Sequence, residues 1–190
     1  MMKKLLLYAI MIVASVNYSF AQSKAGTSVG AFLTIEPSAR IAGMGNAGVT
    51  LHGEIEATYY NPAAIGYFSG YGAQFSHSPW LADISYDYAV VAASFGDFGN
   101  VYANVTSLNS GEIDVRTVEK PLGTGERYTV SNVAFGIGYG RQVSERFSVG
   151  VQVNYITETI WHSSLSAFSL NVGTIYRISE DGMHIGASIS

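Results

Sequence analysis

Apolar side chains alternate with small or polar ones through three segments in the C-terminal half of the chain. The first segment begins near Tyr128 and ends at Gly140, the second spans 147–155, and the third spans 168–177. Because successive side chains of a β-strand point to opposite faces, this alternation predicts three strands that each have one apolar face. Each segment reaches the roughly 9–11 residues with which a tilted strand crosses the hydrocarbon layer of a membrane.

Weaker alternation predicts four more strands, at 67–77, 81–95, 100–108 and 183–190. Tight, turn-like connections lie at 96–99, 141–145 and 179–182, whereas 109–127 is a long, polar and charged connection. Outer-membrane barrels have short periplasmic turns and longer outer loops. If the first strand starts in the periplasm, every tight turn falls on the periplasmic side, in agreement with that topology.

The two faces of the regular strands differ in chemistry. The apolar face has aromatic residues near both ends, Phe147 and Tyr155 on one strand and Phe168 and Tyr176 on the next, as is typical of a lipid-facing surface. The opposite face carries glycine, serine and asparagine, which suit a lumen or a plug contact. Charged residues make up only 13% of the chain, which fits a transmembrane barrel, but composition alone does not separate it from a soluble, glycine-rich β-sandwich. The pattern favours an all-β transmembrane barrel over a soluble β-sandwich, whose apolar face would turn inward.

The N-terminus has the features of a secretory signal. Lys3 and Lys4 precede an apolar run at 5–16, and small residues around Ala21 predict a signal peptide at 1–21 and a mature chain that begins at Gln22. The run is shorter than the roughly 18 residues of a membrane helix. The chain has no cysteine, which excludes a lipoprotein anchor, a disulfide framework and a thiolate metal site.

The segment 22–66 is rich in glycine and alanine and lacks the period of a long helix or strand. Gly43, Gly45 and Gly48 fit the dinucleotide pattern G-x-G-x-x-G, but that pattern needs a strand before it and a helix after it, and neither is predicted here. We interpret the glycines instead as positions where the segment packs closely against a barrel wall. The segment closes on Asn61, Pro62 and Ala63, which predict a rigid corner before the strands at 67–190.

Several motifs occur together along the mature chain: GTS near its start, FL, ARIAGMGNAG, YYNPA, HSPW and GTGE. In combination they resemble the PorV/PorQ family, which is itself similar to the FadL-type outer-membrane transporters. The resemblance implies a plugged outer-membrane barrel of about fourteen strands, in keeping with the even-number rule. It places Asn61, Pro62 and Ala63 in the N-terminal hatch, as structural residues.

The same resemblance implies two functions. PorV-like proteins are associated with type IX secretion, where they receive cargo through its C-terminal domain and pass it on at the cell surface. A FadL-like transporter would instead move a hydrophobic small molecule through the plugged barrel. The expected partners are outer-membrane lipid and either secretion-system proteins with their cargo or such a small molecule.

Chemistry-bearing residues are sparse. No two of the four histidines have a metal-ligand spacing, and no catalytic triad is arranged in the sequence, so we expect no metal, no cofactor and no enzymatic activity. His77 and Trp80 belong to the HSPW motif, which indicates either a turn with an interfacial tryptophan or a contact to a ligand or partner. The net charge of −4 without a basic stripe argues against nucleic acid.

The predicted strand count of seven is odd, whereas bacterial single-chain barrels have even numbers. An open half-sheet would leave two unpaired edges in lipid. We therefore expect the sequence to be the N-terminal portion of a longer protein, about half of a FadL-like barrel. If the chain ended at Ser190, an oligomeric barrel or a soluble sandwich would be the alternatives.

Overall fold

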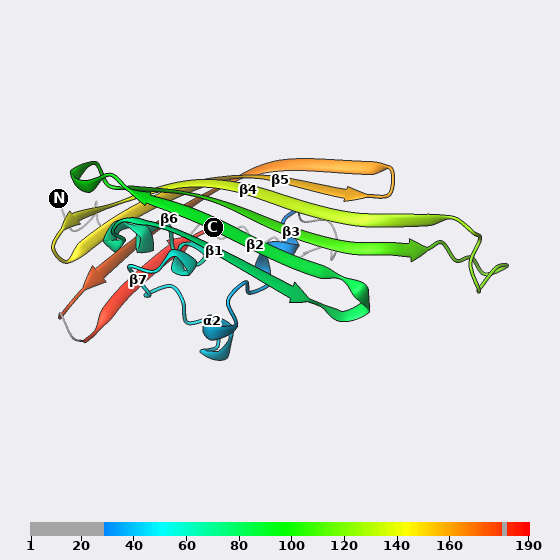
Figure 1. The fold of residues 1–190 in the computed structure, drawn as a ribbon, viewed down its shortest axis with the longest axis horizontal. Helices are drawn as coiled ribbons and strands as arrows, with labels where there is room; N and C mark the ends of the chain where they lie inside the picture. The colour runs from blue at the N-terminus through cyan, green and yellow to red at the C-terminus, as the bar shows by residue number, and fades with distance from the viewer. Residues whose placement is uncertain (1–28, 180–181) are drawn as a thin grey trace, which may run out of the picture.

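The chain forms one antiparallel β-sheet of seven strands, in a computed structural model that describes residues 29–179 and 182–190 (Figure 1). The strands follow one another across the sheet in chain order. Their bounds are β1 (Tyr71–Pro79), β2 (Ser85–Ser94), β3 (Asn100–Asp114), β4 (Arg127–Ser144), β5 (Phe147–Ile160), β6 (Ser163–Arg177) and β7 (His184–Ile189). The predicted all-β class is confirmed. The predicted signal peptide at 1–21 and part of the turn at 179–182 lie outside the described residues.

Most strands differ from their predicted bounds: β5 ends at Ile160 rather than at 155, β6 begins at Ser163 rather than at 168, and β1 and β2 begin later than predicted. Tyr67 ends a 3-10 helix, so that β1 begins at Tyr71 rather than at 67. The stretch Leu81–Asp83 is the helical turn η4, so that β2 begins only at Ser85. Asp83 therefore belongs to the turn, whereas Asp87 lies on β2.

Strands β3 and β4 are longer than predicted, and the connection between them shrinks to 115–126. Beyond a bulge after Asn109, Glu112 pairs with Thr129 and Asp114 pairs with Arg127. The guanidinium of Arg127 lies 2.6 Å from the carboxylate of Glu112 and 3.2 Å from that of Asp114. Charged residues that indicated a loop are thus cross-strand ion pairs at the end of two long strands.

One face of the sheet is apolar and exposed. Exposed side chains on this face include Phe75, Val91, Phe135, Ile137, Val153, Leu170 and Ile185. The predicted aromatic ends lie opposite each other: Phe147 faces Tyr176, with ring centroids 6.5 Å apart, and Tyr155 faces Phe168 at 5.0 Å. The strand between these two pairs spans about 26 Å at roughly 3.3 Å per residue.

The opposite face is covered by the N-terminal segment, which Figure 1 shows in blue to teal along one side of the sheet. This segment contains only short elements: η1 (Ala31–Thr34), α2 (Ala39–Gly43), η2 (Ile55–Tyr59) and η3 (Pro62–Tyr67). A further turn, η5 (Gly96–Phe98), joins β2 to β3. No helix among residues 29–179 and 182–190 is long and apolar enough to cross a membrane.

The buried core lies between the segment and the sheet. Its main cluster contains Phe32, Ile65, Tyr86, Tyr88, Val90, Ala92, Tyr102, Ala134 and Ile156. A smaller cluster packs three alanines of the segment against Ile175 of β6. Within the described residues, β1 and β7 each pair with one neighbouring strand only, so each leaves one edge open.

Candidate functional site

We name Asn61, Pro62 and Ala63 the corner. The corner packs closely against three glycines of the sheet. Gly140 of β4, Gly150 of β5 and Gly173 of β6 lie opposite one another in register and form a row across three strands. A methyl group on Gly150 would collide with the backbone of the corner, and one on Gly173 would collide with the amide of Asn61. Because glycine has no side chain, the row forms a trough in the sheet, and the corner fits into this trough.

Asn61 fixes the corner through three hydrogen bonds, and it is fully buried. Its Oδ1 accepts from the amide of Ala63 at 2.9 Å, which caps η3. Its Nδ2 donates to the carbonyl of Val49 at 2.8 Å and to that of Thr174 at 3.1 Å. One side chain thus joins two parts of the segment to β6.

Side chains of the sheet satisfy the carbonyl groups around the corner. Ser148 Oγ donates to the carbonyl of Ala63 at 2.7 Å. Asn100 Nδ2 donates to the carbonyl of Phe68 at 2.9 Å and also reaches that of Ile65. These bonds come from β3 and β5, so that the polar residues of the covered face act as fixed partners for the backbone of the segment.

Gly43, Gly45 and Gly48 were predicted to pack against the sheet, and none of them does. Methyl groups on Gly43 and Gly45 would have nothing within 4 Å, so neither glycine packs against the sheet. A methyl group on Gly48 would lie 2.7 Å from the ring of Tyr60, within the segment itself. Gly45 has a φ of +67°, which gives it a backbone role in a turn. We name residues 39–48 the flap; residues 42–47 of it are exposed, whereas Ile41 and Gly48 are buried.

An ion-pair network, here named the latch, joins the flap to β1. Arg40 pairs with Glu54 and, through its Nε at 2.8 Å, with Glu56. The carboxylate of Glu56 also accepts from Ser38 Oγ at 3.0 Å and from Gln74 Nε2 of β1 at 3.1 Å. Burial alone would raise the pKa of Glu56, but these hydrogen bonds outweigh it and hold the pKa below its usual range.

Tyr59 ties the start of the described segment to the core. Its hydroxyl lies 2.7 Å from the carbonyl of Leu33 and 3.1 Å from the hydroxyl of Tyr86. Tyr86 in turn donates to the carbonyl of Ile35 at 2.9 Å. Burial, reinforced by Tyr86, raises the pKa of Tyr59 far above its ordinary value, so that this hydroxyl stays protonated and acts as a donor.

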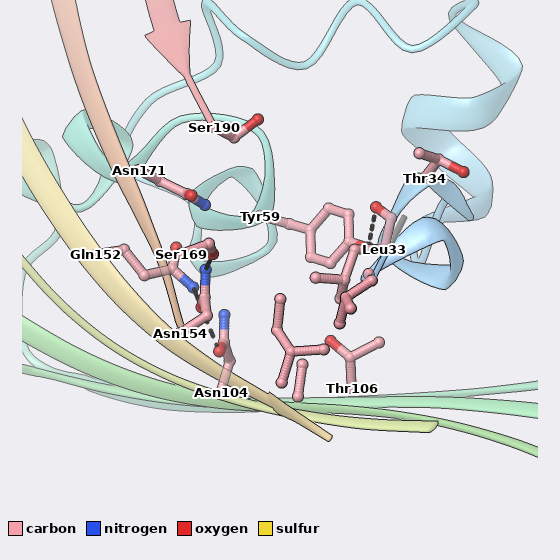
Figure 2. Close-up of a pocket in the computed structure, with 14 residues that line it drawn as sticks. Leu33, Thr34, Tyr59, Asn104, Thr106, Gln152, Asn154, Ser169, Asn171 and Ser190 are labelled. Atoms are coloured by element: carbon pink, nitrogen blue, oxygen red, sulfur yellow. Dashed lines mark hydrogen bonds between the residues drawn. The ribbon is translucent and has the colours of Figure 1, made fainter. Parts of the chain in front are cut away.

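A cavity of about 300 Å³ lies between the segment and the sheet (Figure 2). Leu33, Thr34 and Tyr59 of the segment line one side, while the sheet contributes mainly amides and hydroxyls: Asn104, Thr106, Gln152, Asn154, Ser169 and Asn171. Tyr102 donates to Gln152 at 2.8 Å, Gln152 to Asn154 at 2.6 Å, and Asn154 to Ser169 at 3.0 Å. The cavity is therefore lined by a polar ladder that runs across β3, β5 and β6.

His77 and Trp80 lie at the hairpin between β1 and β2, and neither lines this cavity. His77 Nδ1 lies 2.6 Å from the carboxylate of Asp87 on the neighbouring strand. This pair is on the exposed face, since it shares the face of Phe75 and Ala89. Trp80 is half exposed. The structure thus separates the HSPW residues from the corner and gives His77 a cross-strand partner.

One cluster of histidine, tyrosine and arginine side chains was not predicted from the spacing of residues in the sequence. His52 and His184 are far apart in the chain, yet their ring centroids are 4.5 Å apart, next to Tyr67 and Arg177. Within the described ranges, no group of three or more histidine, cysteine or carboxylate side chains could hold a metal ion. Only the register that places Arg177 opposite His184 could have revealed the cluster.

Comparison with known proteins finds no family model and no curated protein that matches the chain.

Proposed function

We propose that the sheet is part of the wall of an outer-membrane β-barrel, with the N-terminal segment as a plug in its lumen. The observation that supports this is the inversion of the two faces. In a soluble sandwich the apolar face is covered and the polar face meets water. Here an apolar face is exposed, while the face that the segment covers carries core residues on β2 and β3 and many glycine, serine and asparagine residues on β4–β6.

The dimensions of the exposed face support lipid as its environment. The aromatic pairs Phe147–Tyr176 and Tyr155–Phe168 bound an apolar band of about 26 Å. Barrel surfaces in the outer membrane have an apolar band about 25 Å tall with aromatic girdles. The open edges of β1 and β7 would be costly in lipid, so such a wall needs further strands from the same polypeptide or another copy.

For the function of this barrel, we infer a PorV/PorQ-like role in type IX protein secretion, without enzymatic chemistry. The loop at 115–126 supports a protein partner, because Val118 and Leu122 are almost fully exposed in it. Large apolar side chains in an exposed loop are suited to protein contacts. The alternative is a FadL-like transporter of hydrophobic small molecules. The half-exposed latch would suit the movable plug of such a transporter.

The test is a deletion strain complemented with variants. We expect deletion to leave cargo with the C-terminal sorting domain in the periplasm. The double substitution Val118→Ser and Leu122→Ser should reproduce this defect, while Val143→Ser, at the opposite end of β4, should not. Uptake of a radiolabelled long-chain fatty acid is measured in parallel. Normal secretion with lost uptake would contradict the secretion role and support the transporter.

A further inference from the structure

A cluster of nitrogen and hydroxyl groups lies at the end of the sheet opposite the loop at 115–126. His52 and Tyr67 of the segment meet Arg177, which ends β6, and His184, which begins β7. The ring of His52 is 5.0 Å from that of Tyr67 and 4.5 Å from that of His184. The guanidinium of Arg177 stacks over the ring of Tyr67 at 5.3 Å.

Three buried polar atoms of this cluster have no hydrogen-bond partner among the described residues: Tyr67 Oη, Arg177 Nε and His184 Nε2. Buried polar groups in native structures are nearly always satisfied. The hydroxyl, the guanidinium N–H and an imidazole N–H can all donate. Three groups that can donate, from three separate elements, thus belong to one cluster in which the described residues provide no acceptor for them.

We propose that His52, Tyr67, Arg177 and His184 bind a small oxyanion, a phosphate or a carboxylate group. The planar guanidinium suits such a group because its N–H donors match the spacing of two oxygens. A cation is disfavoured because Arg177 carries a fixed positive charge in the cluster. This site does not depend on the proposed function, since it rests only on contacts between the segment and β6–β7.

The electrostatics of the cluster agree with this ligand. Burial lowers the pKa of His52, and the neighbouring His184 and Arg177 lower it further, while a hydrogen bond to the backbone carbonyl of Thr50 and the carboxylate of Glu54 oppose them. Without an anion, the cluster therefore disfavours the charged imidazolium. A bound oxyanion reverses this preference, so that binding must raise the pKa of His52, and protonation must strengthen binding by the same factor.

The experiment is an NMR titration of the full chain, extracted in detergent and labelled with ¹³C-histidine, with inorganic phosphate at constant ionic strength. The four histidines are assigned by single His→Gln variants. We expect saturable shifts of His52 and His184 and a raised pKa of His52, with no change at His77 and His162. A parallel titration with acetate separates the two classes: a response to phosphate alone assigns a phosphate group, and a response to acetate assigns a carboxylate.

Two charge-matched variants locate the site. Arg177→Gln should weaken phosphate binding at least about tenfold, the loss expected for one charged hydrogen bond. Arg146→Gln removes the same charge from an exposed neighbour and should leave binding unchanged. Equal loss in both variants, or no saturable shift in the unmodified chain with either anion, would overturn the proposal. Should Arg177→Gln fail to fold, Tyr67→Phe replaces it, because it removes one donor and keeps the ring.

Discussion

The corner and the flap belong to the same N-terminal segment but are held in opposite ways. Residues 61–66 are all buried, rest on the glycine row and have their polar groups satisfied by the sheet. Residues 42–47 are all exposed, and the latch that joins the flap to β1 is partly open to solvent. Close packing of the corner against the glycines stabilises its position. Surface ion pairs contribute little to the free energy of folding and are screened by salt. The corner is thus built as an anchor, whereas the flap is held by the buried Ile41 and by ion pairs that are partly open to solvent.

The largest effect should follow from filling the trough. Gly150→Ala places a methyl group in the backbone of the corner, which cannot yield like a flexible side chain. We expect a loss of about 3 kcal/mol in the free energy of unfolding, at the upper end of overpacking costs. Chemical unfolding in detergent measures it.

Gly43→Ala is the matched control, because its methyl group has open space. It should change stability by less than about 0.5 kcal/mol, as surface substitutions do. An equal cost at both glycines would remove the contrast between corner and flap.

The next effect should come from Asn61. Asn61→Ala leaves the carbonyls of Val49 and Thr174 and the amide of Ala63 without their partner in a buried site. We expect a loss of about 2 kcal/mol, since each unsatisfied buried group is costly. Asn109→Ala removes a single exposed bond to Gly111 and should cost far less in the same unfolding measurement. Similar costs for the two variants would mean that the corner is not an anchor.

How far the sequence predicts this architecture depends on the range of the interactions involved. Alternation within a strand is local, and it predicted the three strands of the C-terminal half and the aromatic residues on their apolar face, although β5 and β6 extend five residues beyond the predicted ends. The ends of β3 and β4 were misjudged, because Asp114 and Arg127 neutralise each other only after the strands pair.

The candidate site was predicted less well for the same reason. Asn61, Pro62 and Ala63 were recognised from their local turn chemistry, but the trough beneath them exists only in the register of Gly140, Gly150 and Gly173. The glycines at 43–48 were predicted to pack against the barrel wall because they are closely spaced, as in the pattern G-x-G-x-x-G. In the structure, a methyl group on Gly43 or Gly45 would meet no close neighbour. No local sequence pattern distinguishes these two glycines from glycines that pack closely against other residues.

A smaller effect should follow from opening the latch. Glu56→Gln removes the charge that Arg40 binds and keeps the shape of the side chain. We expect faster hydrogen exchange at the amide of Ala42, which is bonded to Ser38, by roughly tenfold at most, as suits a partly exposed ion pair. The amide of Ala64, bonded to Asn61, should exchange at an unchanged rate. Equal acceleration at both amides would mean that flap and corner open together.

The smallest effect is the pH dependence of the same latch. The folded state holds the pKa of Glu56 below its usual value, so the stabilisation it provides is complete above that value. It is lost as the pH falls through the lowered pKa, when the carboxylate binds a proton. Exchange at Ala42 should therefore accelerate in acid relative to the intrinsic rate, and Glu56→Gln should abolish this change. A pH dependence that survives in the variant would assign the effect to another group.

The central claim is that successive side chains along β5 point alternately to lipid and to the plug. Because the chain has no cysteine, single cysteines at Val151, Gln152, Val153 and Asn154 can each carry one spin label in the outer membrane. We predict that labels at 151 and 153 collide with dissolved oxygen and little with a water-soluble nickel complex, as in lipid. Labels at 152 and 154 should show low oxygen access under the plug. Accessibility without this alternation, or nickel access greatest at 151 and 153, would contradict the account.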